Sequence, residues 1–445
     1  MKKQTMLLIL IFHLITFMAQ AQEGADHIDD SEKQEVIDSI SNILESDYVY
    51  PDVALEMIAL VKKKMSVGDY SDINDPDEYA QQLTSDLQSV SNDLHLRINF
   101  TPEQISQWRN ASQSEEDSIA MAERRLNNNR RNNYGFQEIK ILDGNVGYLD
   151  LTGFFHVDEE AGATAQAAMN YLSNADALII DLRQNGGGSP SMIQLITSYL
   201  YGPEPVHLNS FYYRPTDERT QTWTLPYVPG KRRPDIDVYV LTSGRTFSAA
   251  EEFSYNLRNL ERATLVGETT GGGAHPGGTR IATDRYMIWV PTGRAINPIT
   301  DTNWEGTGVE PHIKVPAGKA LETAHVEALK KMKESRSKDD QFSLQWAIDG
   351  LKAKANPIEI DADILEQYAG NYGPRMIKYE NGSLFYQREG NPRYMLIPMS
   401  TDTFMIEEIP YFRIKIIKEG NNVIAIQGLY NDGRTDKNLK TSSTP

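Results

Sequence analysis

The chain contains no cysteine. This absence excludes disulfide bonds, a thiolate nucleophile and the lipid-bearing cysteine of bacterial lipoproteins. Basic residues are also scarce, because 44 lysines and arginines stand against 62 aspartates and glutamates, which gives a net charge of −18. No basic stretch is long enough to follow a phosphate backbone, so we expect no nucleic-acid partner.

Long apolar runs are absent except at the N-terminus. Two lysines precede an apolar run over residues 6–18, and Ala19-Gln20-Ala21 follows it. A charged, then apolar, then small-x-small order is typical of a secretory signal peptide, and the run is shorter than the roughly 20 residues of a membrane-spanning helix. We predict cleavage after Ala21, export to a periplasm or the cell exterior, and no integral membrane segment in the mature protein.

A chain of 445 residues exceeds what one hydrophobic core supports, so several domains are expected. Apolar residues at helical spacing predict a helical N-terminal domain over 22–100, and a polar segment over 101–134 indicates a linker or flap. Strand-like runs, helical patterns and glycine loops predict an α/β layered core over 135–335. A helical linker over 336–356 and an antiparallel β accessory domain over 357–445, with Asn-Gly and Asp-Gly turns, complete the prediction.

One serine stands at a strand-to-helix corner. An apolar run at 238–241 comes before Ser248, and a helical pattern follows it. A helix start presents free backbone N–H groups and the positive end of the peptide dipoles, which suits an oxygen that develops negative charge. The alternative is that Ser248 only caps the helix, as serines commonly do.

Two glycine loops follow strand-like runs. Gly186-Gly187-Gly188 ends the run that begins at Ala177, and Glu268 precedes Gly271-Gly272-Gly273. Consecutive glycines let backbone N–H groups face a ligand, as in an oxyanion hole. A phosphate cradle is weakly supported, because no Walker lysine follows and the spacing differs from Gly-x-Gly-x-x-Gly.

A serine nucleophile needs a base with a pKa near 7 and a carboxylate that orients this base. Of the eight histidines, three lie near the motifs: His95, His156 and His275. For each of them alone, a structural role is the more common fate, so the residues themselves leave the base open.

Four motifs together resemble the tail-specific, or carboxy-terminal processing, serine peptidases. They occur in the family's order over about 135–316: Asp181-Leu-Arg-Gln-Asn-Gly-Gly-Gly188, Thr246-Phe-Ser-Ala-Ala-Glu251, Gly267-Glu-Thr-Thr-Gly-Gly272 and Glu305-Gly-Thr-Gly-Val-Glu-Pro-His-Ile313. The helical region is similar to the N-terminal domain of the branch that includes the interphotoreceptor retinoid-binding protein and the tricorn core. The resemblance implies a ClpP/crotonase-like core and no PDZ domain.

The resemblance also implies a site. One branch of the family uses a lysine as its base, but Gly273 stands at that position here, so a lysine dyad is not expected. The tricorn-like branch uses a histidine in an Asp-x-His context, which His95 matches, with Glu268 as its carboxylate. His275 remains the alternative base.

The other parts of the implied site are the oxyanion donors and a fourth residue. Backbone N–H groups of Gly187, Gly188 and Ala249 are expected to hold the oxyanion. Leu94 replaces the small residue that usually precedes the histidine, so a fourth residue must come from elsewhere, with Ser91 and Asp93 as candidates. We interpret Glu251 and its neighbour Glu252 as structural.

The resulting prediction is an exported serine endopeptidase that hydrolyses extended peptides or unfolded proteins and needs neither a metal nor an organic cofactor. The alternative is a catalytically inert protein of the same fold that carries an apolar ligand or a peptide. The sequence leaves the oligomeric state open.

Overall fold

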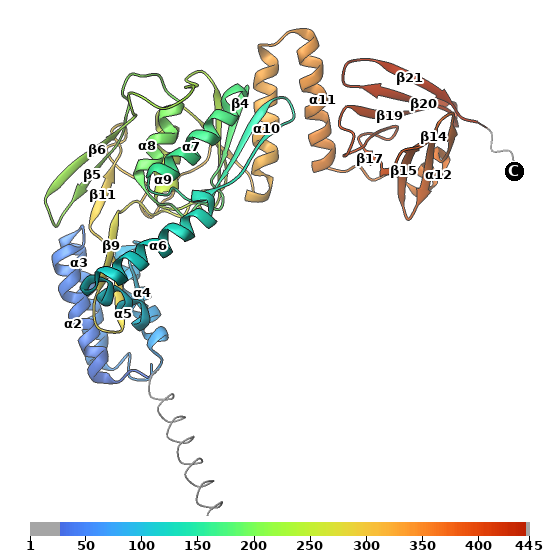
Figure 1. Cartoon of the computed structure of the whole chain (residues 1–445). Helices are drawn as coiled ribbons and strands as arrows, with labels where there is room; N and C mark the ends of the chain where they lie inside the picture. The colour runs from blue at the N-terminus through green and yellow to red at the C-terminus, as the bar shows by residue number, and fades with distance from the viewer. Residues whose placement is uncertain (1–26, 442–445) are drawn as a thin grey trace, which may run out of the picture.

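The computed structural model describes residues 27–441, and the predicted signal peptide at 1–21 lies outside this range. None of the helices within it is long and apolar enough to span a membrane. Figure 1 shows a helical N-terminal unit, an α/β core and a small β domain at the C-terminus. This arrangement confirms the predicted fold class.

Three helices build most of the N-terminal unit: α2 (Asp30–Asp47), α3 (Pro51–Val67) and α4 (Pro76–Ser91). The carboxylates of Asp29 and Asp75 cap α2 and α4 by accepting hydrogen bonds from backbone N–H groups three residues later. The apolar faces of the three helices form one core. The helices therefore form where the spacing of apolar residues predicted them.

A three-stranded sheet joins this unit to the rest of the chain. β1 (Arg97–Phe100) pairs with β10 (Tyr286–Pro291), and β10 pairs with β9 (Gly277–Ile281), all antiparallel. The side chains of Tyr286, Ile288 and Val290 are buried among those of the N-terminal helices. The predicted domain boundary was therefore wrong here: residues 277–291 belong to the N-terminal unit, because strands far apart in the sequence pair with each other.

The segment predicted as a linker or flap is helical. It forms α5 (Pro102–Gln113) and α6 (Glu115–Arg131), and the side chain of Ser114 caps α6. No residue of α6 is buried. A polar helix that lies on the surface lacks the apolar stripe by which helices are recognised in a sequence, which explains the difference from the prediction.

The core is a six-stranded sheet in the order β12-β8-β7-β4-β3-β2. Its strands are parallel except for β2, which pairs antiparallel with β3. They are β2 (Phe136–Leu142), β3 (Val146–Leu151), β4 (Ala177–Asp181), β7 (Asp237–Thr242), β8 (Thr264–Gly267) and β12 (Ile313–Lys314), and a short 3-10 turn, η1 (Asn133–Gly135), leads into β2.

Helices cover both faces of this sheet. One core cluster contains side chains of α7 (Glu159–Tyr171), α8 (Pro190–Tyr199) and α9 (Ala249–Asn259). The other contains side chains of α10 (Ala317–Glu334) and α11 (Lys338–Ala355). The turn η2 (Leu172–Asn174) follows α7, and a three-stranded sheet of β11 (Gly293–Ile296), β5 (His207–Tyr213) and β6 (Glu218–Trp223) completes the core. These layers match the α/β prediction.

The C-terminal domain has its own hydrophobic core. It begins with α12 (Ala362–Tyr368) and continues in two antiparallel sheets. The first contains β13 (Gly370–Tyr372), β14 (Arg375–Glu380), β15 (Ser383–Arg388) and β16 (Arg393–Met395). The second contains β17 (Ile397–Pro398), β18 (Thr403–Met405), β19 (Phe412–Glu419), β20 (Asn422–Tyr430) and β21 (Thr435–Leu439).

Candidate active site

The three motif loops meet at one edge of the core sheet. β4, β7 and β8 are neighbouring parallel strands, so their carboxyl ends lie side by side. The triple-glycine loop follows β4, Ser248 follows β7, and the second glycine loop follows β8. Binding sites in open α/β sheets are commonly formed at this edge.

Ser248 occupies the corner between β7 and α9 in an unusual backbone conformation. It stands at the N-cap position of α9 with φ 55° and ψ −122°. A non-glycine residue with positive φ is strained, and such strain is maintained only where the surrounding structure enforces it. The conformation favours a functional role for Ser248 over simple capping.

Glu251, interpreted from the sequence as structural, has a specific role at this corner. Its carboxylate is fully buried and accepts hydrogen bonds from the N–H of Ser248 at 2.9 Å and of Gly273 at 2.8 Å. It also accepts from the Thr270 hydroxyl and the Gly272 N–H. Burial raises the pKa of Glu251, while these donors oppose the change. Glu251 therefore joins the serine corner to the second glycine loop.

The triple-glycine loop approaches Ser248 closely. A Cβ atom placed on Gly187 would lie 2.8 Å from the Ser248 Cβ, and Gly187 has φ +113°. Asn185 fixes the loop, because its side chain accepts from the Gly187 N–H at 2.9 Å and its backbone carbonyl accepts from the Phe247 N–H. Only glycine fits at position 187, because the Cβ atom of any other residue would be too close to the Ser248 Cβ.

These contacts correct one predicted oxyanion donor. The Gly187 N–H is already bonded to Asn185, so it does not point a free donor into the site. Within residues 27–441, the N–H groups of Gly188 and Ala249 have no hydrogen-bond partner. Ala249 begins α9, where backbone donors lack partners in the helix. The backbone N–H groups of Gly188 and Ala249 thus remain as the two candidate oxyanion donors.

His95 reaches the site from the N-terminal unit. It lies just before β1, and its ring stacks on Trp289 of β10 at a centroid distance of 4.9 Å and contacts Phe247 at 4.6 Å. Burial lowers the pKa of His95 to about 4, although the Asp93 carboxylate acts in the opposite direction. The imidazole is therefore neutral at pH 7 and has a lone pair that can accept a proton, and its pKa without a bound substrate lies below the value near 7 expected of the base.

Phe247 connects His95 with the nucleophile corner, because it directly precedes Ser248 in the sequence. Within residues 27–441, the side chains of Ser248 and His95 form no hydrogen bond with each other, and the two backbone N–H groups donate to Glu251 and Asp93. Hydrogen bonds between catalytic groups are often long or misaligned before a substrate binds.

Gly273 explains why a lysine is absent from the second glycine loop. A Cβ on Gly273 would lie 2.7 Å from His95 Cε1 and 2.3 Å from the Phe247 ring. A side chain at this position would occupy the space of the imidazole. The lysine and histidine solutions to the base therefore exclude each other at this site.

Glu268 does not accompany His95. One of its carboxylate oxygens accepts from the N–H of Ala317 at 2.9 Å, and the other accepts from the N–H of Gly244 at 3.4 Å. Ala317 is the first residue of α10, so Glu268 stabilises the start of that helix. The prediction that Glu268 orients His95 is wrong, because the loop after β8 directs this side chain towards α10.

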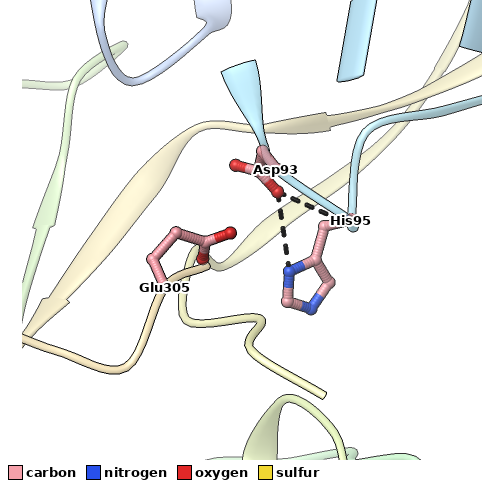
Figure 2. A group of neighbouring side chains, drawn as sticks. All are labelled: Asp93, His95 and Glu305. Atoms are coloured by element: carbon pink, nitrogen blue, oxygen red, sulfur yellow. Dashed lines mark hydrogen bonds and ion pairs between the residues drawn. The ribbon is translucent and has the colours of Figure 1, made fainter. Parts of the chain in front are cut away.

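Two other carboxylates lie beside His95, and Figure 2 shows them approaching from two different loops. Asp93 is fully buried; its Oδ1 accepts from the backbone N–H of His95 at 3.0 Å and lies 3.9 Å from His95 Nδ1. One oxygen of Glu305 also lies within 4.8 Å of the donor atoms of the other two residues. Burial, with Asp93 nearby, raises the pKa of Glu305 to about 7.

Glu305 could have been found from the sequence. It opens the fourth motif, Glu305-Gly-Thr-Gly, to which no role was given. The structure holds this motif against the second glycine loop, since Gly306 N–H donates to the Gly272 carbonyl at 2.9 Å and Ala274 N–H donates to Glu305. Asp93, by contrast, was among the predicted candidates for a fourth residue.

The remaining candidates lie in other surroundings. His275 is buried, with Nδ1 2.7 Å from Asp93 Oδ2 and 3.3 Å from Glu305 Oε2, and Nε2 3.5 Å from the Tyr50 hydroxyl. His156 is exposed beside two serines that follow the triple-glycine loop. Ser91 Oγ donates to the Leu87 carbonyl within α4. Of the three histidines, His95 is the one that contacts the loop of Ser248.

A large open hollow lies elsewhere, between α5 and α6. It has a volume of about 1160 Å³ and is lined by residues that include Phe100, Trp108, Met121, Arg124 and Arg125. No candidate catalytic residue lines it. The hollow therefore does not identify the reaction centre.

Solved structures of similar fold include proteases. The photosystem II D1 C-terminal processing protease is 22% identical with a TM-score of 0.32, and the match covers 39% of this chain and 42% of that protein. The tricorn protease is 13% identical with a TM-score of 0.41, covering 72% and 37%. A lipoprotein from Streptococcus agalactiae is 13% identical with a TM-score of 0.45, covering 67% and 96%. The chain thus spans less than half the length of the two proteases.

Family comparisons agree with the motifs. Residues 145–315 match peptidase family S41, and residues 28–134 match the N-terminal domain of peptidase S41 in eukaryotic IRBP. The two matches together cover more than half of the chain and include Ser248, His95 and Glu305. On these grounds the chain belongs to peptidase family S41, a family of serine peptidases.

Proposed function

We propose that the chain is an exported serine endopeptidase that hydrolyses peptide bonds of extended peptides or unfolded proteins. Ser248 is the nucleophile, His95 is the general base, and Glu305 together with Asp93 orients His95. The observation that carries the proposal is the contact of the His95 ring with Phe247, the residue before Ser248. This contact brings a neutral imidazole close to a serine in a strained backbone conformation.

The proposed reaction is acyl transfer. Ser248 Oγ attacks the carbonyl carbon of the scissile bond while His95 Nε2 takes the hydroxyl proton. The tetrahedral oxyanion is held by the free N–H groups of Gly188 and Ala249, and His95 returns the proton to the leaving amine. Water then attacks the acyl-enzyme by the same route, which frees Ser248.

The carboxylates fix the tautomer of His95. Catalysis needs the lone pair on Nε2, so the proton must lie on Nδ1. Nδ1 and Glu305 Oε1 are both buried and have no hydrogen-bond partner in the part of the chain that the structure describes. A small rotation of the Glu305 side chain would let its carboxylate accept this proton's hydrogen bond, which makes Glu305 the proposed orienting residue in place of Glu268.

Labelling with a fluorophosphonate serine probe tests the assignment. We expect labelling of the parent protein, none of Ser248→Ala, and a rate lowered about 10³-fold or more for His95→Ala and Glu305→Gln. Glu268→Gln is the matched control, because it changes a carboxylate that caps α10, and it should be labelled normally. A parent protein that folds but is not labelled would favour the alternative of an inert ligand carrier.

A further inference from the structure

We propose that Asp93, His95 and Glu305 form a zinc site that inhibits the enzyme. The donor atoms of these side chains lie within 4.8 Å of one another (Figure 2). Tetrahedral zinc, with bonds of about 2.0–2.2 Å to nitrogen and oxygen, places its ligand atoms about 3.3 Å apart. The separation of 3.9 Å between Asp93 Oδ1 and His95 Nδ1 is close to this value, and small side-chain rotations supply the rest.

Two buried polar atoms without partners point to a ligand independently of these distances. Only 10% of the His95 side chain is exposed, and its Nδ1 is buried without a hydrogen-bond partner among the described residues. Glu305 Oε1 is likewise buried and without a partner in residues 27–441. Unpartnered buried polar atoms are costly for a folded protein, and this pair can be satisfied in two ways. In the active enzyme a proton on Nδ1 donates to the carboxylate, and in the inhibited enzyme zinc replaces that proton between the two atoms.

The second oxygen of each carboxylate is already held. Asp93 Oδ2 lies 2.7 Å from Nδ1 of His275, and Glu305 Oε2 accepts from the Ala274 N–H. Hydrogen bonds of this kind orient the side chains that ligate a metal. Glu305 therefore has one oxygen anchored by the protein and one without a partner, whereas Asp93 Oδ1 also accepts the His95 backbone N–H at 3.0 Å and would bind the ion through its second lone pair. Solvent can fill the fourth position.

The donor set selects the metal. One imidazole nitrogen and two carboxylate oxygens match the His and Glu ligands of zinc sites. Calcium prefers six to eight oxygens, and magnesium keeps an octahedral shell of oxygens and waters. Millimolar magnesium or calcium should therefore not replace micromolar zinc.

Zinc on Nδ1 stops His95 from acting as a base. When the Nδ1 lone pair is bound to zinc, the neutral ring carries its hydrogen on Nε2, which then has no lone pair for the Ser248 proton. Inhibition requires no unfolding and reverses when the metal leaves. This inhibitory effect rests on the proposed role of His95, whereas zinc binding itself does not.

Isothermal titration of the tag-free, metal-free protein with zinc chloride tests the site. We expect one zinc per chain, and an affinity at least about 100-fold lower for Glu305→Gln and for Asp93→Asn. His156→Gln is the matched control, because His156 is an exposed histidine outside the cluster and should leave binding unchanged. Circular dichroism identifies a variant that has not folded. If Asp93→Asn, at a fully buried position, fails to fold, the comparison of Glu305→Gln with the parent protein decides the test, because Glu305 is partly exposed.

The outcomes separate the two proposals. Zinc should also block fluorophosphonate labelling, and a chelator should restore it. Absence of one-to-one binding, or binding that Glu305→Gln and His156→Gln leave equally strong, would overturn the zinc site. Binding without loss of labelling would overturn the inhibitory mechanism. A parent protein that binds zinc but never reacts with the probe would contradict the proposed peptidase function and leave the metal site standing.

Discussion

The carboxylate of Glu251 accepts a hydrogen bond of 2.9 Å from the backbone N–H of Ser248, three residues earlier in the chain. The same carboxylate binds the N–H groups of Gly272 and Gly273, so it fixes the serine corner relative to the loop that lies against His95. This residue is a positioning residue, since it contacts the backbone of the nucleophile and not its reactive oxygen.

Glu251→Gln should impair both stability and activity. The amide keeps one acceptor but turns an NH₂ group towards N–H donors that the carboxylate now satisfies. Hydrogen bonds to a charged group are worth about 1.5–3 kcal/mol each, so we expect a loss of about 3 kcal/mol or more in the free energy of unfolding. Urea unfolding measures this loss, and the labelling rate of Ser248 should fall with it. An unchanged labelling rate would contradict the positioning role.

Gly187→Ala should lower the labelling rate about 100-fold while the fold survives. The new methyl group would lie 2.8 Å from the Ser248 Cβ, and alanine is strained at φ +113°. A displacement of about 1 Å in a catalytic group commonly costs about 100-fold in rate. Gly186→Ala is the matched control, because nothing lies within 4 Å of a Cβ at that position. Equal rates for the two variants would contradict the close approach of the loop to Ser248.

Glu252 should make the protein less stable as the pH rises. Complete burial raises the pKa of Glu252 to about 7 in the folded state, although the nearby side chains of Asn209 and Asn256 act in the opposite direction. The folded protein then holds a proton that the unfolded chain releases near pH 4.5, so stability falls between about pH 4.5 and 7, by about 1.4 kcal/mol per pH unit at most.

Thermal unfolding at several pH values measures this dependence. Glu252→Gln removes the titrating group, so its melting temperature should fall less between pH 5 and pH 8 than that of the parent protein. Glu103→Gln, an exposed position on α5, serves as the control and should keep the parent's pH dependence. A parallel dependence in Glu252→Gln would show that another group is responsible.

Trp346→Ala should loosen the C-terminal domain without affecting the site. Trp346 lies on α11, its indole N–H donates to the Pro410 carbonyl at 2.8 Å, and the Arg413 guanidinium lies 3.7 Å from its ring centre. Loss of these contacts should cost about 2 kcal/mol. Limited proteolysis should release the domain faster, whereas labelling of Ser248 should be unchanged. Trp223→Ala on β6 is the control, and equal digestion of both variants would argue against this contact.

Local patterns in the sequence predicted most of the core correctly. Strand runs that end in glycine loops, and Ser248 between a strand and a helix, lie at one sheet edge as expected, because parallel neighbours align their carboxyl ends. Glu268 misled the prediction because sequence position does not fix the direction of a side chain on a loop. Glu305 and the pairing of β1 with β10 escaped it because both depend on contacts between distant segments.

The pairing of β1 with β10 also bears on how activity is acquired during synthesis. His95 leaves the ribosome long before Glu305, and its ring is held by Trp289, which lies on a strand that is made late. If His95 is the base, as proposed, an incomplete nascent chain contains His95 but lacks Trp289 and Glu305, which position it. Hydrolytic activity is therefore withheld until nearly the whole catalytic unit has been translated and folded, which protects the growing chain and its neighbours from premature cleavage.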